Sequence, residues 1–296
     1  MALLSLLVFA NCSCNLNSVT SLTKPGSGPG QQAIVLFHGL GETDSVMDDK
    51  IGRDLRQAFP NAEVVALQRN EQQGIAAQAQ KLYQDLQAND LHQKDLVFMG
   101  ISTGGIVAIE TLNQHPALAV RGIIAYHSPL EGAPMVAKKQ VVDTLASHIS
   151  RLPGAVSGVN IKQIFEQYTQ GRAVQDLKPN SSFMTIFKAN LSKVEVPILA
   201  IAGKGGSWAS SIANLYKLDL SNYNAKILSI LNHAWSEQFV GDPDHDGLLP
   251  IDSQLAQHIN NSCIERWSQA GVSHYGAIPP HAREKIKKNI KSYFQQ

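Results

Sequence analysis

The chain has 296 residues, 44% of them apolar and 17% charged, which is enough apolar material for one large core or two modest ones. Its formal net charge of +1 excludes a whole-molecule field that would recruit nucleic acid or an acidic partner. Three cysteines are too few for a disulfide framework and give only weak support to metal or redox chemistry.

The N-terminal segment is expected to precede the folded domain. Its apolar run, residues 2–10, is much shorter than the about 20 residues that cross a bilayer. Residues 1–18 therefore resemble an export signal, or a lipoprotein signal with Cys12 or Cys14 as the acceptor, although no basic residue precedes the run. A buried N-terminal strand is the alternative. Residues 19–32 predict a linker, and the protein is expected in the cell envelope or outside the cell, with a cytoplasmic location still open.

Short apolar segments alternate with helical patterns from residue 33 onward. The segments that predict strands buried on both faces are 33–39, 62–67, 95–100, 121–128 and 196–203. The clearest helical stripe is Ile75, Ala79, Leu82 and Leu86. This alternation predicts an α/β fold with a mostly parallel, doubly wound sheet, in one domain over residues 33–296.

A serine stands between the third of these strands and a helical stretch, in the sequence Gly-Ile-Ser-Thr-Gly over residues 100–104. In this setting the pattern is typical of a nucleophile elbow, a sharp turn that exposes a serine hydroxyl. Glycines on both sides remove Cβ atoms that would collide across the turn. The sequence predicts that Ser102 is a catalytic nucleophile, with the amino end of the next helix directed at the oxyanion.

A second oxyanion donor is expected from the loop after the first strand, which reads FHGLGETD over residues 37–44. Gly39 permits close approach of the backbone, so the N–H of Leu40 is the candidate donor. The N–H of Thr103, the residue after the serine, is the other one. His38 ends a buried strand and is expected to orient this loop through hydrogen bonds rather than to react.

Three segments together resemble the lipase branch of the α/β-hydrolase fold, particularly bacterial triacylglycerol lipases. They are HGLGETD, GISTGG and SPLEGAP (128–134), and the resemblance extends over residues 33–294; DLKPNSSFM (176–184) is similar to the segment that leads from a lid back to the sheet. Thr103 stands where many relatives have Gln, but only its backbone N–H is required. HGLGETDSVMDDKIG has a weaker likeness to palmitoyl-protein thioesterases, which leaves thioesters open as substrates.

The resemblance implies the chain order serine, acid, histidine, so the acid is sought in residues 240–253. Asp246, in Asp-Gly-Leu-Leu-Pro, aligns with the segment that supplies the acid of such lipases. The rival carboxylates are Asp242, Asp244 and Asp252. These aspartates also begin an EF-hand pattern, but the twelfth position is Ser253 rather than Glu and Pro250 lies within the loop, so no bound metal is expected.

The region over about residues 135–190 interrupts the strand pattern and predicts two amphipathic helices that cover the active site as a lid. Their apolar stripes are Val141, Val142, Leu145, Ile149 and Leu152, then Ile161, Ile164, Phe165 and Tyr168. Such faces would line a cleft for an acyl chain. The alternative is that both helices simply pack on the domain.

The C-terminal stretch offers two histidines as the base. His274 follows the expected last strand and turn (265–273). His281 lies in the first turn of a helix whose start is predicted by Pro279 and Pro280. In this fold the base lies on the loop before the final helix, which favours His274. The helix carries a basic face, expected to be solvated, with peripheral contact to a membrane surface as the alternative.

These features predict a serine hydrolase that cleaves carboxylic esters with apolar acyl chains, a lipase or phospholipase-type esterase without a cofactor. Ser102, His274 and Asp246 would form its triad, and Leu40 and Thr103 its oxyanion hole. The expected partner is a lipid or acyl-ester substrate, and no nucleic acid. The alternatives are an acyl thioesterase or acyltransferase with the same triad, and a catalytically inactive binding protein.

Overall fold

The computed structural model describes residues 31–137, 171–216 and 244–296, together with a few positions between 225 and 240. Within these ranges, six strands form one sheet in the order β2-β1-β3-β4-β5-β6, and every neighbouring pair is parallel. The strands are β1 (Gln32–Phe37), β2 (Ala62–Leu67), β3 (Asp95–Ile101), β4 (Val120–Tyr126), β5 (Ile198–Lys204) and β6 (Ile264–Ala270). The predicted parallel α/β fold is confirmed.

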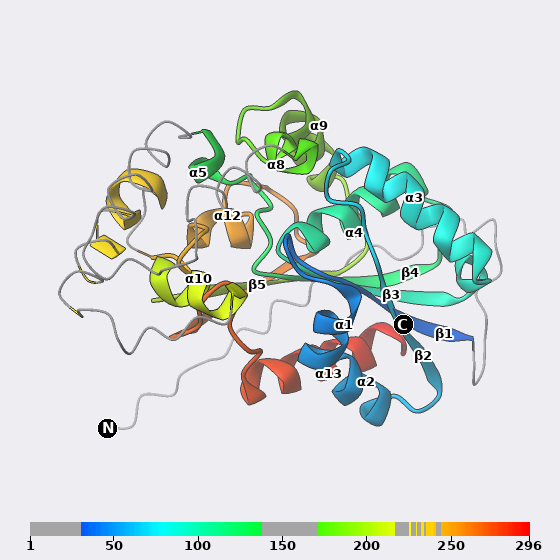
Figure 1. Ribbon diagram of the computed structural model, residues 1–296. Coiled ribbons are helices and arrows are strands. Elements are labelled where there is room, and N and C mark those ends of the chain that lie inside the picture. Colours follow the sequence, from blue (N-terminus) through cyan, green and yellow to red (C-terminus); the bar gives the residue numbers. More distant parts are fainter. Residues whose placement is uncertain are drawn as a thin grey trace, which may run out of the picture.

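Helices cover both faces of the sheet (Figure 1). One face carries α1 (Asp44–Met47), α2 (Arg53–Ala58) and α13 (Pro280–Tyr293), and the other carries α3 (Ile75–Ala88), α4 (Thr103–Gln114), α8 (Arg172–Asp176) and α9 (Ser182–Leu191). The remaining described helices are α5 (Pro134–Ala137), α10 (Trp208–Tyr216) and α12 (Ile251–Leu255), with short turns at Asp48–Gly52, Leu91–Gln93 and Ser236–Val240.

Alternating side chains of the central strands supply two separate cores. In β1, Ala33, Val35 and Phe37 enter the core beneath α3 and α4, whereas Ile34 and Leu36 enter the core beneath α13. All five are fully buried. Each large side chain buried in this way contributes about 1.5–3 kcal/mol, so a continuous apolar strand is stable only with both faces covered.

The order of the strands places a reversal between β1 and β3. From β1 the chain moves outward to β2, then returns to β3 on the opposite side of β1 and continues toward β6. Ligands of such sheets bind outside the carboxyl ends of the strands at this reversal. Phe37 pairs with Gly100 in register, so the loops after β1 and β3 begin side by side.

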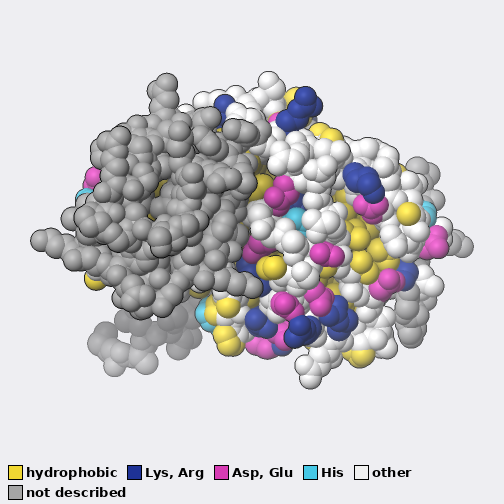
Figure 2. Space-filling model, viewed as in Figure 1, with side chains coloured by type: hydrophobic (Ala, Val, Ile, Leu, Met, Phe, Trp, Pro, Cys, Tyr) yellow, Lys and Arg dark blue, Asp and Glu magenta, His cyan; other side chains and the backbone are white. Residues whose placement is uncertain are grey.

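The helical stripe predicted over residues 75–86 is confirmed. Ile75, Ala79, Leu82 and Leu86 are buried in α3, and the buried residues of α13 are Ala282, Ile286, Ile290 and Tyr293. Three cations of α13 pair with carboxylates, Arg283 with Asp54, Lys285 with Glu265 and Lys287 with Glu284. On the face shown in Figure 2, acidic and basic side chains are interspersed around the described part of the surface.

Some strand ends differ slightly from the predicted ones, and the first strand ends at Phe37 rather than at residue 39. The fourth strand ends at Tyr126 rather than at residue 128, since His127 has φ 50°. The last strand ends at Ala270, just before Gly271 with φ 72°.

No helix in the described ranges combines the length and apolar character needed to span a bilayer. The N-terminal signal segment and both predicted lid stripes lie outside the described residues.

Candidate active site

Ser102 occupies a strained turn between β3 and α4. Its φ of 53° and ψ of −124° lie in a region that L-residues rarely adopt. A Cβ at Gly100 would overlap the backbone of Gly104 and Gly105, and a Cβ at Gly104 would lie 2.8 Å from the carbonyl oxygen of His38. The helix therefore reaches the sheet only because these positions lack side chains, as the sequence predicted.

The structure brings Ser102, His274 and Asp246 together in one line of hydrogen bonds. The Oγ of Ser102 lies 2.8 Å from Nε2 of His274, and Nδ1 of His274 lies 2.7 Å from Oδ2 of Asp246. All three side chains are buried. With Nδ1 protonated toward the carboxylate, Nε2 is left as an acceptor for the serine hydroxyl proton.

The carboxylate of Asp246 is fully buried and held from both sides. Its Oδ1 accepts hydrogen bonds from the N–H groups of Leu248 (3.0 Å) and Leu249 (2.9 Å), while Oδ2 faces His274. Burial acts to raise the pKa of Asp246, but His274, His127 and the N–H of Leu249 together outweigh it, and the pKa is lowered. The backbone N–H of His274 also donates to the Asp246 carbonyl at 2.8 Å, which fixes the two loops to each other.

The rival residues lie elsewhere. Asp244 and Asp252 are exposed, and Asp242 is outside the described residues. His281 is exposed in the first turn of α13, where its ring packs edge-on against Trp267 at a centroid distance of 5.8 Å. The structure thus places only Asp246 and His274, among the described candidates, beside Ser102.

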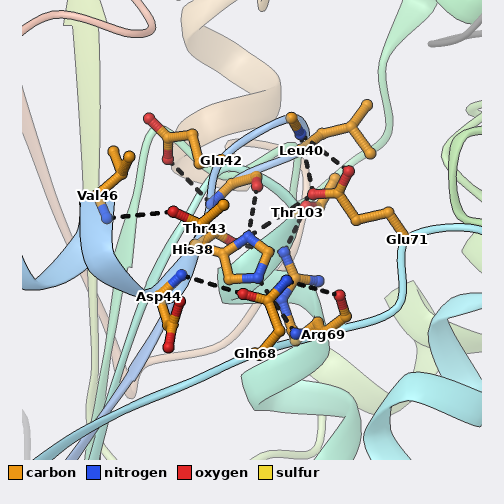
Figure 3. A network of polar contacts seen from close by, with 12 residues as sticks. His38, Leu40, Glu42, Thr43, Asp44, Val46, Gln68, Arg69, Glu71 and Thr103 are labelled. Atoms are coloured by element: carbon orange, nitrogen blue, oxygen red, sulfur yellow. Dashed lines mark hydrogen bonds and ion pairs between the residues drawn. The ribbon is translucent and has the colours of Figure 1, made fainter.

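The loop after β1 is fixed by two acidic side chains (Figure 3). Glu42 Oε2 accepts the N–H of Gly39 at 3.1 Å, and both oxygens of Glu71 accept the N–H of Gly41 at 2.9 Å. No hydrogen bond from the N–H of Leu40 or of Thr103 is found among the described residues. These are the two N–H groups that the sequence predicts as oxyanion donors.

His38 orients this loop from within the core. Its Nδ1 lies 2.8 Å from the Gly39 carbonyl and its Nε2 accepts the N–H of Arg69 at 3.2 Å, so the proton resides on Nδ1 and is donated to Gly39. Burial, together with the charge of Arg69, lowers the pKa of His38 to about 4. The imidazole is therefore neutral near pH 7, in the orienting role that the sequence predicted.

Arg69, which the sequence analysis missed, connects the loop to the elbow (Figure 3). Its buried guanidinium donates to the His38 carbonyl, to Oε1 of Gln78 at 2.7 Å and to Oγ1 of Thr103 at 3.2 Å. Burial lowers the pKa of Arg69 to about 10, offset in part by Glu71 and Glu42, so the side chain stays charged. An arginine after an edge strand carries no sequence signal for this role, because its partners are 31 and 34 residues away.

A second histidine, His127, gathers with Asp246 and His274 into a group that has the side-chain types of a metal site. The spacing does not fit an ion. Around a tetrahedral zinc with bonds of about 2.0–2.2 Å, two ligand atoms lie about 3.3 Å apart. The 2.7 Å between Nδ1 of His274 and Oδ2 of Asp246 is a hydrogen-bond distance, which leaves room for a proton and not for a metal.

Sheet, elbow and strand order define an α/β-hydrolase fold, and solved structures share it. The mature lipase BlEst2 of Bacillus licheniformis superposes with a TM-score of 0.54 at 17% identity, over 90% of this chain and 94% of that one. The esterase RhEst1 of Rhodococcus sp. ECU1013 gives 0.51 at 13% identity over 92% and 93%, and the monoacylglycerol lipase of Paleococcus ferrophilus gives 0.53 at 15% over 90% and 96%. No protein-family model and no curated protein matches the chain in sequence.

Proposed function

We propose that the protein is a serine hydrolase of carboxylic esters, with Ser102 as nucleophile, His274 as base and Asp246 as the acid that orients the histidine. The observation that carries this proposal is the unbroken pair of contacts, 2.8 Å from Ser102 Oγ to His274 Nε2 and 2.7 Å from His274 Nδ1 to Asp246 Oδ2. The strained φ of Ser102 supports it, because strain of this kind persists where it serves a function.

The reaction follows from these positions. His274 Nε2 takes the hydroxyl proton as Ser102 Oγ forms a bond to the ester carbonyl carbon, and the carbonyl oxygen becomes an oxyanion. The N–H groups of Leu40 and Thr103 would hold this oxyanion. The imidazolium then gives its proton to the leaving alcohol, and an acyl-enzyme remains. Water, deprotonated by the same nitrogen, releases the carboxylic acid and restores the serine.

The substrates we propose are esters with medium or long apolar acyl chains, lipids in particular. Two of the structurally similar proteins are named lipases. On this chain, Met135 and Phe183 lie toward the two ends of the region predicted to form the lid, and both are partly buried against the main core. If the segment covers the site, each methylene of an acyl chain that it buries contributes about 0.8 kcal/mol. Esters of such chains are then expected to have a higher kcat/KM than acetyl esters.

Thioester hydrolysis and acyl transfer are the second candidate, on the observation that residues 38–52 read HGLGETDSVMDDKIG, similar to palmitoyl-protein thioesterases. The same triad serves both reactions. Product analysis separates them, since a thioesterase releases a thiol and an acyltransferase passes the acyl group to an added alcohol.

We further propose that residues 1–18 direct export and that residues 19–32 link them to the domain. Cell fractionation combined with mass spectrometry of the mature N-terminus tests this. A free N-terminus at residue 1 in the cytoplasmic fraction contradicts it.

The deciding experiment for the activity is labelling with a fluorophosphonate, followed by a screen of acyl esters, phospholipids and acyl thioesters. Wild type is expected to be labelled at Ser102 and to hydrolyse esters, and Ser102→Ala to do neither. Undiminished labelling of Ser102→Ala would place the nucleophile elsewhere. A wild-type protein that neither reacts nor hydrolyses any of these compounds would contradict the proposal and favour a binding protein.

A further inference from the structure

His127 is a buried histidine beside the triad to which neither the sequence nor the proposed reaction assigns a role. It directly follows β4, with φ 50° and no exposed surface. Its ring stacks on Tyr126 at a centroid distance of 4.1 Å. On another side the ring packs closely against Gly203, because a Cβ added to this glycine would lie only 2.7 Å from Cε1 of His127. The imidazole is therefore held in one orientation.

That orientation directs Nδ1 at the acid of the triad. Nδ1 lies 3.5 Å from Oδ2 of Asp246, the same oxygen that accepts from His274. This nitrogen is buried and has no hydrogen-bond partner in the described part of the chain. On the opposite edge of the ring, Nε2 lies 3.3 Å from the side-chain amide of Gln269, which in turn contacts the hydroxyl of Tyr126 at 2.7 Å.

The charges around the ring decide where its proton is. Burial, then the charges of His274 and Lys50, outweigh the attraction of Asp246 and a contact with the backbone of His274, and they lower the pKa of His127 to about 3, so the ring is neutral at working pH. A neutral imidazole carries one N–H. A lone pair on Nδ1 facing a carboxylate oxygen 3.5 Å away would be repelled, whereas an N–H there is attracted. The proton therefore belongs on Nδ1.

We propose that His127 is a positioning residue of the active site, a second histidine whose neutral Nδ1–H is directed at Oδ2 of Asp246 and moderates the charge that this oxygen presents to His274. The inference rests on the proposed function of the triad. A carboxylate that shares its charge with one more donor holds an imidazolium less strongly. His127 thereby keeps His274 available as a base at lower pH. It also holds Oδ2 of Asp246 in the position where this oxygen accepts the hydrogen bond from His274.

A matched pair of substitutions tests the role. Asn places its amide nitrogen where Nδ1 lies and tolerates positive φ, whereas Leu has nearly the shape of Asn but no donor. His127→Asn is expected to retain kcat within about threefold of wild type. His127→Leu is expected to lose about tenfold in kcat, with KM little changed, and the acid limb of its rate profile moves up by about half a pH unit. Thermal unfolding of both variants reports the strain that Leu adds at this φ.

A second measurement does not depend on activity or on the His127→Leu variant being folded. Nitrogen-15 NMR of wild-type protein labelled in its histidine rings distinguishes the two neutral tautomers, and the His127 signals are assigned by their loss in His127→Asn. The inference requires a protonated Nδ1 and an unprotonated Nε2 on His127 throughout the pH range in which the protein is active. The opposite tautomer overturns it.

The outcomes also separate this inference from the proposed function. Rate profiles of His127→Leu and wild type that coincide, in an active enzyme, overturn the inference and leave the hydrolase intact. Absence of any ester hydrolysis by wild type contradicts the hydrolase. In that case the tautomer and the pH dependence of the His274 ring signals in the two variants still decide whether His127 acts on Asp246.

Discussion

The guanidinium of Arg69 donates a hydrogen bond to the hydroxyl of Thr103, with 3.2 Å between Nη2 and Oγ1. The same nitrogen donates to the carbonyl of His38. One buried side chain therefore joins the loop after β1 to the turn after β3, the two backbone segments that carry the predicted oxyanion donors. Their relative position depends on a cation that contacts no reacting atom.

Thr103→Val is expected to reduce kcat about fivefold while KM changes little. Val has the shape of Thr but no oxygen, so the buried N–H of Arg69 loses its acceptor, a cost of about 1–3 kcal/mol. The backbone N–H at position 103 is retained in both cases. Thr103→Ser, which keeps the hydroxyl, is the matched control and should behave like wild type. Equal kcat and equal thermal stability in the Val and Ser variants would show that the contact is unimportant.

Gly104→Ala is expected to destabilise the protein by about 2 kcal/mol or more, although alanine favours helices over glycine by about 1 kcal/mol. The added Cβ would overlap the carbonyl oxygen of Phe37, which is backbone and cannot turn aside. Gly271→Ala is the control, because its φ of 72° adds strain while no atom lies within 4 Å of the new Cβ. Urea unfolding of both variants measures the difference. A Gly104→Ala protein as stable as wild type would show that β1 and α4 can separate.

The stability of the protein is expected to decrease at acidic pH, over a pH range that His38 partly determines. Its pKa is lowered from 6.5 to about 4 in the folded state, so the unfolded chain binds the proton first as the pH falls. The contribution of neutral His38 to the free energy of unfolding is complete above pH 6.5 and is lost as the pH falls from there through about 4. This contribution amounts to about 3 kcal/mol. His38→Gln, which cannot gain this proton, should show a shallower decline of Tm between these limits, and an unchanged decline contradicts the assignment.

His274→Ala is expected to lose activity on the order of a millionfold in kcat, as when the base of other triads is removed, while His281→Ala changes kcat less than about threefold. His281 is exposed and contacts Trp267 rather than Ser102. Single-turnover hydrolysis of an activated ester measures both. An inactive His281→Ala protein beside an active His274→Ala protein, both folded, would move the base to α13.

Asp246→Asn should lose about ten-thousandfold in kcat with the fold preserved, because an amide supports the wrong tautomer of the histidine. The matched control is Asp244→Asn, which removes an exposed carboxylate two residues away. Circular dichroism confirms folding of both proteins. Normal turnover in the Asp246 variant with loss in the Asp244 variant would exchange their roles.

Local patterns were enough to predict most of the sheet and the turn at Ser102, whereas Asp246 and His274 were predicted through the resemblance to lipases, which gives the chain order of the triad. Runs of apolar residues gave five strands, and the glycines around Ser102 gave the turn. Arg69 and His127 were not predicted, because their roles depend on partners far along the chain. In the sequence, Arg69 looks like a solvated cation and His127 like the end of a strand. Only in the folded protein does Arg69 contact Thr103 and His127 lie beside Asp246. The end of β4 was predicted two residues too late, because the sequence does not show the positive φ of His127.

The contact between His274 and Asp246 joins residues 28 apart, whereas that between His274 and Ser102 joins residues 172 apart. During synthesis the serine therefore leaves the ribosome long before its base. A nascent chain that has folded β1 through β4 already has the elbow but no group to deprotonate it. On the proposed mechanism, hydrolysis begins only when the loop after β6 has emerged, so the chain cannot attack acyl esters while most of it is still being made.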